Sequence, residues 1–168
     1  MSIPRNYRIV ISFMLFVPFF ISCNPNRVFE ESRVIPEGIW NRKDHVKFEV
    51  PISDTNARYD FYFTVRNSTD YPYSNLYFFI HSVIPGNIRT VDTVECELAD
   101  YTGKWKGTGM GGVKYNRFLF QEHVHFRKAG TYFFELEQAM RVTELAGIRD
   151  IGLRIEKNSK WPDQKETK

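Results

Sequence analysis

The sequence lacks most of the features that would place a protein in a disulfide-rich, nucleic-acid-binding or membrane-spanning class. Only two of its 168 residues are cysteines, so a framework of several disulfides is excluded. Its basic residues (23) and acidic residues (20) are nearly balanced and form no basic stripe, which argues against a nucleic-acid partner. The longest apolar run, at residues 9–21, is shorter than a membrane-spanning helix, which needs about 20 residues. No Gly-x-Ser-x-Gly nucleophile motif is present, and no long stretch has helical periodicity.

The beginning of the chain has the layout of a secretory signal. A basic start is followed by the charge-free run 9–21, and Ser22 precedes Cys23. The sequence Phe-Ile-Ser-Cys at 20–23 resembles a bacterial lipobox, with Phe20 where leucine is usual. The resemblance implies that diacylglycerol is transferred to the Cys23 thiol and that the chain is cleaved between Ser22 and Cys23. The alternative is an ordinary cleaved signal with an incidental cysteine.

Amino-acid composition and the positions of turn-forming residues divide the chain into four predicted segments. Residues 1–22 form the lipoprotein signal peptide, and 23–40 form a mixed polar tether. Residues 41–157 form one β-sandwich domain, and 158–168 form a polar C-terminal tail. Removal of the signal peptide takes away two arginines and lowers the formal charge from +3 to +1. The remaining chain is long enough to build a core.

Apolar and polar residues alternate with period 2 through most of the body, which is typical of half-buried strands. One example is 46–50, where valine and phenylalanine alternate with lysine and glutamate. The run 76–80 is apolar on both faces, which indicates a central strand or one with an interface. The predicted strands are 46–50, 59–66, 76–80, 91–98, 118–126, 132–137 and 151–156.

Turn signals separate these strands at intervals of roughly ten to fifteen residues, which argues for an antiparallel sandwich or barrel. We predict an all-β, antiparallel two-sheet sandwich, Ig-like or jelly-roll-like, with about eight strands. Only 138–145 has a helical pattern, for about two turns at most. Phenylalanine (15) and tyrosine (9) supply the bulk of the predicted core, and Cys96 is interpreted as a small buried hydrophobe.

Histidines provide the best metal candidate. His123 and His125 stand two residues apart on a predicted strand, so their rings would project from one face. No carboxylate follows at short spacing to complete a ligand set, so we expect both rings to face solvent. His45 and His81 lie in different predicted strands, and nothing in the sequence indicates that they meet. We predict no metal site and no cofactor.

Two further motifs are weak. The glycine-rich segment 107–112 precedes a predicted strand rather than a helix, so it is interpreted as a hairpin or bulge and not as a phosphate-binding loop. The Asp-Thr-Val sequence at 92–94 is similar to an acceptor motif for protein O-glycosylation in some envelope bacteria.

An aromatic run precedes the centre of the predicted sheet. Tyr71, Tyr73 and Tyr77 share one parity, opposite Leu76 and Phe78. The functional interpretation is a docking patch for another protein or a stacking platform for sugars, and the alternative is that both faces belong to the core. The candidate contact residues are Tyr71, Tyr73, Tyr77 and Trp105.

Several segments together resemble the gliding-motility-associated GldH lipoproteins. They are residues 66–67, 71–77, 92–95, 98–100, 103–109, 130–132, 137–141 and 145–152. The resemblance implies a lipid-anchored envelope protein of Bacteroidetes-type bacteria that supports assembly or stability of the motility machinery. The resemblance implies no catalytic residues. The one functional site that it implies is the lipidated cysteine, which corresponds to Cys23.

These observations predict a non-enzymatic, lipid-anchored scaffold or stability factor. Its partners would be the membrane, other envelope lipoproteins and motility-machinery proteins, with no nucleic acid and no small-molecule substrate. The alternative is a glycan-binding module, and an enzymatic interpretation would depend on His123 and His125 alone. Asn24 stands where an aspartate would favour inner-membrane retention, and no acidic run follows Cys23, so we expect the outer membrane facing the periplasm.

Overall fold

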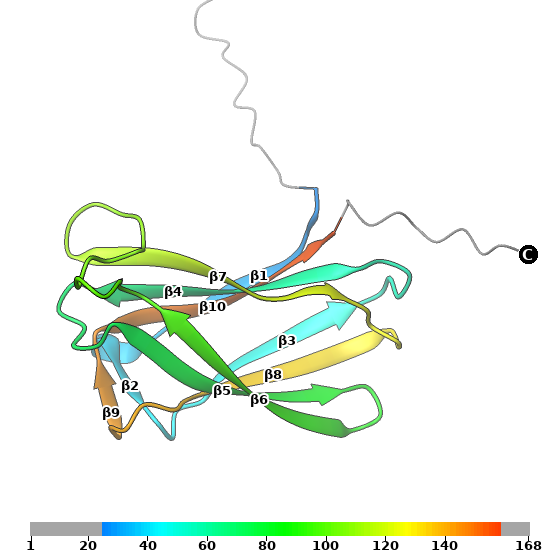
Figure 1. Cartoon of the computed structure of the whole chain (residues 1–168). Helices are drawn as coiled ribbons and strands as arrows, with labels where there is room; N and C mark the ends of the chain where they lie inside the picture. The colour runs from blue at the N-terminus through cyan, green and yellow to red at the C-terminus, as the bar shows by residue number, and fades with distance from the viewer. Residues whose placement is uncertain (1–24, 159–168) are drawn as a thin grey trace, which may run out of the picture.

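The computed structural model describes residues 25–158, which form an all-β structure (Figure 1). The strands are β1 (Arg27–Val34), β2 (Ile39–Asn41), β3 (Val46–Ile52), β4 (Tyr59–Ser68), β5 (Asn75–Ile84), β6 (Ile88–Glu97), β7 (Val113–Val124), β8 (Gly130–Gln138), β9 (Glu144–Ala146) and β10 (Ile148–Lys157). A single turn of 3₁₀ helix, η1 (Pro36–Gly38), separates β1 from β2.

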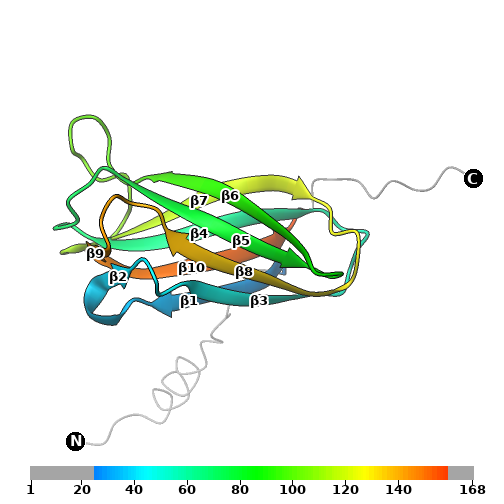
Figure 2. The same ribbon diagram turned by 90° about the horizontal axis from the view of Figure 1, so that it is seen from below.

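The strands form two facing four-stranded sheets and a short ribbon. The first sheet has the order β1-β10-β4-β7, the second has the order β3-β8-β5-β6, and β2 pairs with β9. Every pairing is antiparallel. Figure 1 shows the sheets as two layers, and Figure 2 looks onto the second sheet. The predicted all-β sandwich is therefore confirmed, with ten strands rather than about eight.

Each predicted strand overlaps a strand of the structure, and β3 follows the period-2 alternation throughout. In β3, Val46, Phe48 and Val50 are buried, whereas Lys47 and Glu49 face solvent. A strand presents successive side chains to opposite faces, so one face of β3 packs in the core and the other is exposed to solvent. β3 then pairs with β8 in a register that adds a second row of apolar side chains to the same inner face.

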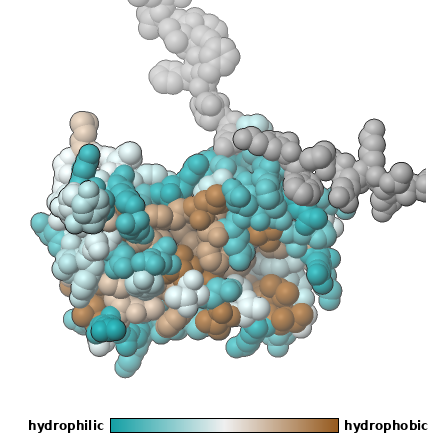
Figure 3. Space-filling view, in the orientation of Figure 1, coloured by the Kyte–Doolittle hydropathy of each residue, from teal (hydrophilic) through white to brown (hydrophobic). Residues whose placement is uncertain are grey.

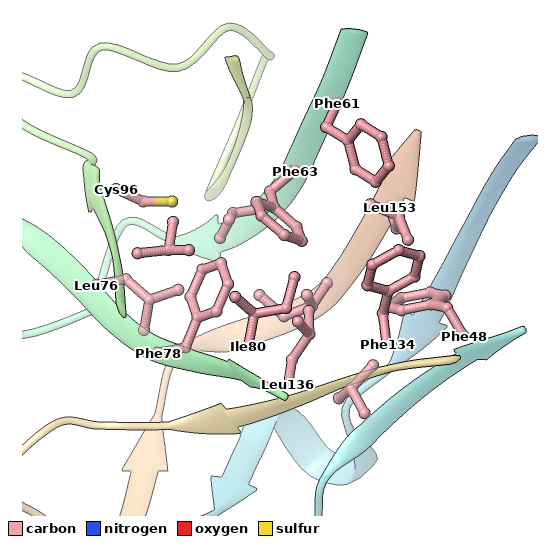
Figure 4. Packing of buried hydrophobic residues seen from close by; sticks show 14 of the residues in the cluster. Phe48, Phe61, Phe63, Leu76, Phe78, Ile80, Cys96, Phe134, Leu136 and Leu153 are labelled. Carbon is pink, nitrogen blue, oxygen red and sulfur yellow. The ribbon is translucent and has the colours of Figure 1, made fainter. Parts of the chain in front are cut away.

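Aromatic rings fill the space between the two sheets (Figure 4). Phe63 on β4 meets Phe78 on β5 edge to face, with ring centroids 5.0 Å apart. Phe78 also lies 6.5 Å from the ring of Trp40, which comes from the short ribbon. Each fully buried aromatic side chain contributes roughly 1.5–3 kcal/mol, so this chain of rings is a main source of stability.

The predicted tether at 23–40 is wrong over the part that the structure describes. β1 starts at Arg27 and pairs with β10 along its length. It is an edge strand that inserts one large side chain, Phe29, which packs against Phe48 with centroids 6.4 Å apart. Its other residues are mostly charged and exposed, with ion pairs such as Arg27–Glu30, so its alternation is too weak to mark a strand.

The helical pattern at 138–145 does not form a helix. β8 continues to Gln138, and β9 begins at Glu144 after a tight bend. The buried Gln138 side chain holds this bend, because its amide donates to the Val142 carbonyl and its oxygen accepts from the Met140 backbone. These bonds satisfy the backbone groups that a helix would otherwise have paired.

Some predictions concern residues outside the described range. The signal peptide 1–22, the cleavage site at Ser22 and Cys23, and the tail beyond Asn158 are among them. Between residues 25 and 158, the structure contains no helix with the length and apolar character needed to cross a membrane.

Candidate interaction surface

β5 lies at the centre of the second sheet and is apolar on both faces. Its inner side chains Leu76, Phe78 and Ile80 are fully buried against the first sheet. On the outer face, Phe79 remains 37% exposed although it stands mid-strand. The prediction that this run forms a central strand is therefore confirmed, and its second face is open rather than part of the core.

Neighbouring strands extend the outer face of β5 into a surface where apolar side chains alternate with polar ones, and we name it the outer-face patch. It consists of Tyr77, Phe79, His81 and Val83 on β5, Val91 on β6 and Phe133 on β8. Val91 lies opposite His81, and Phe133 lies opposite Val83. Phe133 is 44% exposed. Exposed aromatic and aliphatic groups on one face of a sheet are a common feature of protein contact sites.

Two histidines meet within this patch. The rings of His45 and His81 stack in parallel, with centroids 5.9 Å apart. His45 Nδ1 lies 2.9 Å from Glu135 Oε1, and His81 Nε2 lies 3.0 Å from Glu137 Oε2. Lys47 Nζ also approaches Glu135, at 3.2 Å. The arrangement arises because β3 and β5 flank β8, whose two glutamates point outward between them.

The electrostatics of this cluster follow from the partners of Glu135. Partial burial raises the pKa of the Glu135 carboxyl, but hydrogen bonds and charge from Lys47 and His45 outweigh that effect and lower the pKa below its ordinary value. Despite the four convergent side chains, no group of three or more His, Cys, Asp or Glu between residues 25 and 158 has a geometry that could hold a metal ion. The cluster is an ion-paired part of the surface.

The predicted contact tyrosines divide between core and surface. Tyr71 is only 3% exposed, its hydroxyl donates to the Asn75 carbonyl at 2.9 Å, and burial raises its pKa. Tyr71 is therefore a core residue and is not available to a partner. Tyr73 stands beside it, with centroids 5.6 Å apart, and is 36% exposed.

Tyr77 and Trp105 are both half-buried and pack against the core. The Tyr77 hydroxyl donates to the Glu95 carboxylate, which raises the pKa of Tyr77 and lowers that of Glu95. Trp40 is fully buried and donates its indole N–H to the Asp44 carbonyl. Tyr71 and Trp40 are therefore not available to stack on a sugar.

The structure separates His123 from His125. His123 has a positive φ of 56°, which ends the strand alternation, and its backbone N–H donates to Asp60. Its ring lies 2.9 Å from the Asn158 amide, whereas the His125 ring contacts the Thr55 carbonyl. Both side chains are exposed, as expected from the sequence.

The structure places both weak motifs, the glycine-rich segment 107–112 and the Asp-Thr-Val sequence at 92–94. The glycine-rich segment 107–112 leads directly into β7, which agrees with a hairpin and not with a phosphate-binding loop. Thr108 forms a bridge with Tyr115 on that strand. Thr93 of the 92–94 motif is exposed on β6, and its glycosylation stays a prediction.

Comparison with known proteins places this sandwich in a family. The family model described as GldH lipoprotein matches residues 27–155, which run from the start of β1 into β10. The chain belongs to the GldH lipoprotein family. The family match includes β1, so this strand is part of the domain that GldH proteins share.

Two curated relatives of the GldH family cover most of the chain. The gliding motility lipoprotein GldH homolog of Christiangramia forsetii is 35% identical over 156 residues, which are 89% of this chain and 95% of that protein. The gliding motility lipoprotein GldH of Flavobacterium johnsoniae is 31% identical over 142 residues, which are 80% of this chain and 87% of that protein. No solved structure matches the chain.

Proposed function

We propose that this chain is a non-enzymatic, lipid-anchored envelope protein that supports a gliding-motility or envelope complex by binding another protein. The observation that carries the proposal is the outer-face patch, where Phe79 and Phe133 are exposed on paired strands of the second sheet. Large apolar side chains on a regular scaffold cost little ordering entropy on binding, so they suit a stable contact. The names of both relatives support a role in gliding motility.

The anchor in this proposal is a lipid on Cys23. Only three residues separate Cys23 from Arg27, the first residue of β1. A tether of that length keeps the sandwich close to the bilayer, which raises its effective concentration toward partners in the same membrane. We place it in the outer membrane, facing the periplasm.

The test is crosslinking in cells, with a photoreactive amino acid at position 91 on the rim of the outer-face patch. We expect capture of a specific envelope protein in the parent. Phe79→Ser with Phe133→Ser should remove that product, because both side chains are exposed and their loss leaves the core intact.

The matched control is Leu119→Ser, which removes an exposed apolar side chain from the first sheet. It should leave the crosslink unchanged. An unchanged crosslink in the Phe79/Phe133 double variant, or an equal loss in Leu119→Ser, would contradict the proposed binding surface.

A further inference from the structure

The two long sides of the sandwich differ in whether their edge strands close over the interior. On one side, the edge strands β1 and β3 are brought together by the packing of Phe29 against Phe48. On the other side, the edge strands β6 and β7 leave the interior accessible. Ile88, Thr90 and Asp92 share the inward parity of the buried Val94, yet all three are exposed.

An apolar groove of about 570 Å³ lies on this open side. Its walls come from both sheets, and the side chains that form most of them are Phe61, Phe120, Phe126, Ile80, Ile84 and Phe134. Figure 3 shows the corresponding apolar band between β7 and β6, with polar residues around it. The volume is within the range of about 300–1,000 Å³ that is typical of small-ligand sites.

Positive charge gathers at one end of the groove. Arg127 and Lys128 line it from the connection between β7 and β8. Lys128 Nζ lies 3.7 Å from the position that a Cβ on Gly86 would occupy, so the ammonium group reaches the turn between β5 and β6. Neither cation has a salt bridge to an acid within residues 25–158. Asp92 stands on the β6 rim of the groove.

The cationic end of the groove lies at the end of the sandwich where the described chain begins. Val124 pairs with Tyr59, and Tyr59 pairs with Lys157. The Lys157 backbone N–H in turn donates to the Asn26 carbonyl at 2.7 Å. If Cys23 carries the anchor proposed above, three residues, about 10 Å of extended chain, connect this end of the sandwich to the bilayer surface.

We infer that the groove binds the acyl chain of an anionic amphiphile, with the chain between the sheets and the acidic head group at Arg127 and Lys128. The apolar walls match a hydrocarbon chain. The two cations, which have no salt bridge among residues 25–158, complement a carboxylate or phosphate. The cationic end of the groove lies at the same end of the sandwich as the proposed anchor, on which this inference partly rests, and so within reach of membrane lipids.

A β-strand of a partner protein, paired with the free edge of β6 or β7, fits this side of the sandwich less well than a lipid does. β6 carries the charge of Asp92 on its inward parity, and the pairing of β7 with β4 contains two register shifts. Inward charges and bulges are the usual means by which edge strands resist pairing with another chain. The segment before β7 also pairs with this strand at Tyr115. A peptide strand is therefore the competing outcome of the test.

The test uses the full chain isolated from cell membranes and placed in phosphatidylcholine vesicles. One arm adds a photoreactive palmitate from solution, and a second arm builds a photoreactive phosphatidylglycerol into the vesicles. A third arm adds the uncharged alcohol with the same chain. Crosslinked residues are located by mass spectrometry. We expect both acidic probes to label the walls of the groove, and the alcohol to label them at least about tenfold less, because it lacks the charge.

Two variants separate the parts of the site. Thr90→Trp places a large ring at the exposed rim of the groove and should reduce labelling at least about tenfold. Arg127→Gln with Lys128→Gln should reduce labelling by the acids to the level of the alcohol. The matched control, Lys43→Gln with Arg141→Gln, removes two exposed cations elsewhere and should change nothing.

The outcomes distinguish a failure of the proposed groove from a failure of the proposed anchor. If the anchor is absent, the protein will not float with vesicles, but soluble palmitate will still label the groove. If the protein floats and neither acid labels the groove, the inference is overturned. Labelling that is equal in all variants, or competition by an extended apolar peptide but not by palmitate, would also overturn it.

Discussion

His45 and His81 stack in parallel across the outer face of the second sheet, with an interplanar angle of 2°. The two residues are far apart in the sequence and belong to segments that do not pair with each other. β8 lies between them and presents Glu135 and Glu137 to the two rings. The ion-paired cluster is therefore a product of strand order.

Acid should destabilise this cluster. The pKa of Glu135 is lowered in the folded state, so its contribution to the free energy of unfolding is present above its ordinary pKa of 4.5 and is lost as the pH falls through the folded value. We expect Glu135→Gln to cost about 0.2–1 kcal/mol at pH 7, because the pair is partly exposed, and to cost less at pH 3.

Urea unfolding at pH 7 and pH 3 measures this effect. Glu122→Gln, at an exposed position on β7, is the control and should not change the pH dependence. A cost of Glu135→Gln that is equal at both pH values would contradict the role assigned to Lys47 and His45.

The contact between Phe63 and Phe78 should dominate core stability. Phe63→Ala removes a fully buried ring between the sheets, and we expect a loss of about 3–5 kcal/mol in the free energy of unfolding. Phe79→Ala, one residue away from Phe78 but on the outer face, should cost less than about 1 kcal/mol. Equal losses in urea melts would show that the two faces of β5 are assigned incorrectly.

Gly152 should tolerate no side chain. An added Cβ would lie 2.2 Å from Thr64 Oγ1, 2.5 Å from Ser32 Oγ and 2.9 Å from the Glu31 carbonyl oxygen. Gly152→Ala must displace the Thr64 and Ser32 hydroxyls and crowd the Glu31 carbonyl, and we expect a cost of about 1–3 kcal/mol. The control is Gly112→Ala, where the nearest atom is 3.7 Å away. Thermal unfolding of both variants distinguishes the sites, and a Gly152→Ala protein as stable as the control would refute this packing.

Cys96 should be chemically inert in the folded protein. Its side chain is completely buried, and burial raises the pKa of the thiol to about 12. The thiolate is the reactive form, so a thiol reagent at pH 8 should modify Cys96 only after unfolding in urea. Rapid modification of the native protein would show that the core opens near β6.

Lipid attachment should depend on one residue. We expect Cys23→Ser to abolish incorporation of a clickable palmitate and to leave the precursor uncleaved. Cys96→Ser is the control, because that position is buried in the sandwich and should not affect labelling. Labelling that persists in Cys23→Ser would refute the proposed anchor.

The sequence predicts the contact surface only in part. Leu76, Phe78 and the outward Phe79 follow strict alternation, and the structure confirms their faces. Tyr71 does not follow it, because β5 begins only at Asn75 and the preceding residues form a turn. Period 2 applies within a strand, so it carried no information about where the Tyr71 side chain points.

The sequence by itself determined seven of the ten strands, β3 to β8 and β10, because alternating apolar side chains can be buried in only one way on a pleated strand. Only the tertiary structure decided which strands are neighbours. That order places His45 beside His81, admits the charged β1 as an edge strand, and leaves an apolar groove between β6 and β7. Such contacts join segments far apart in the chain and depend on how two sheets stack, which no local pattern of residues records.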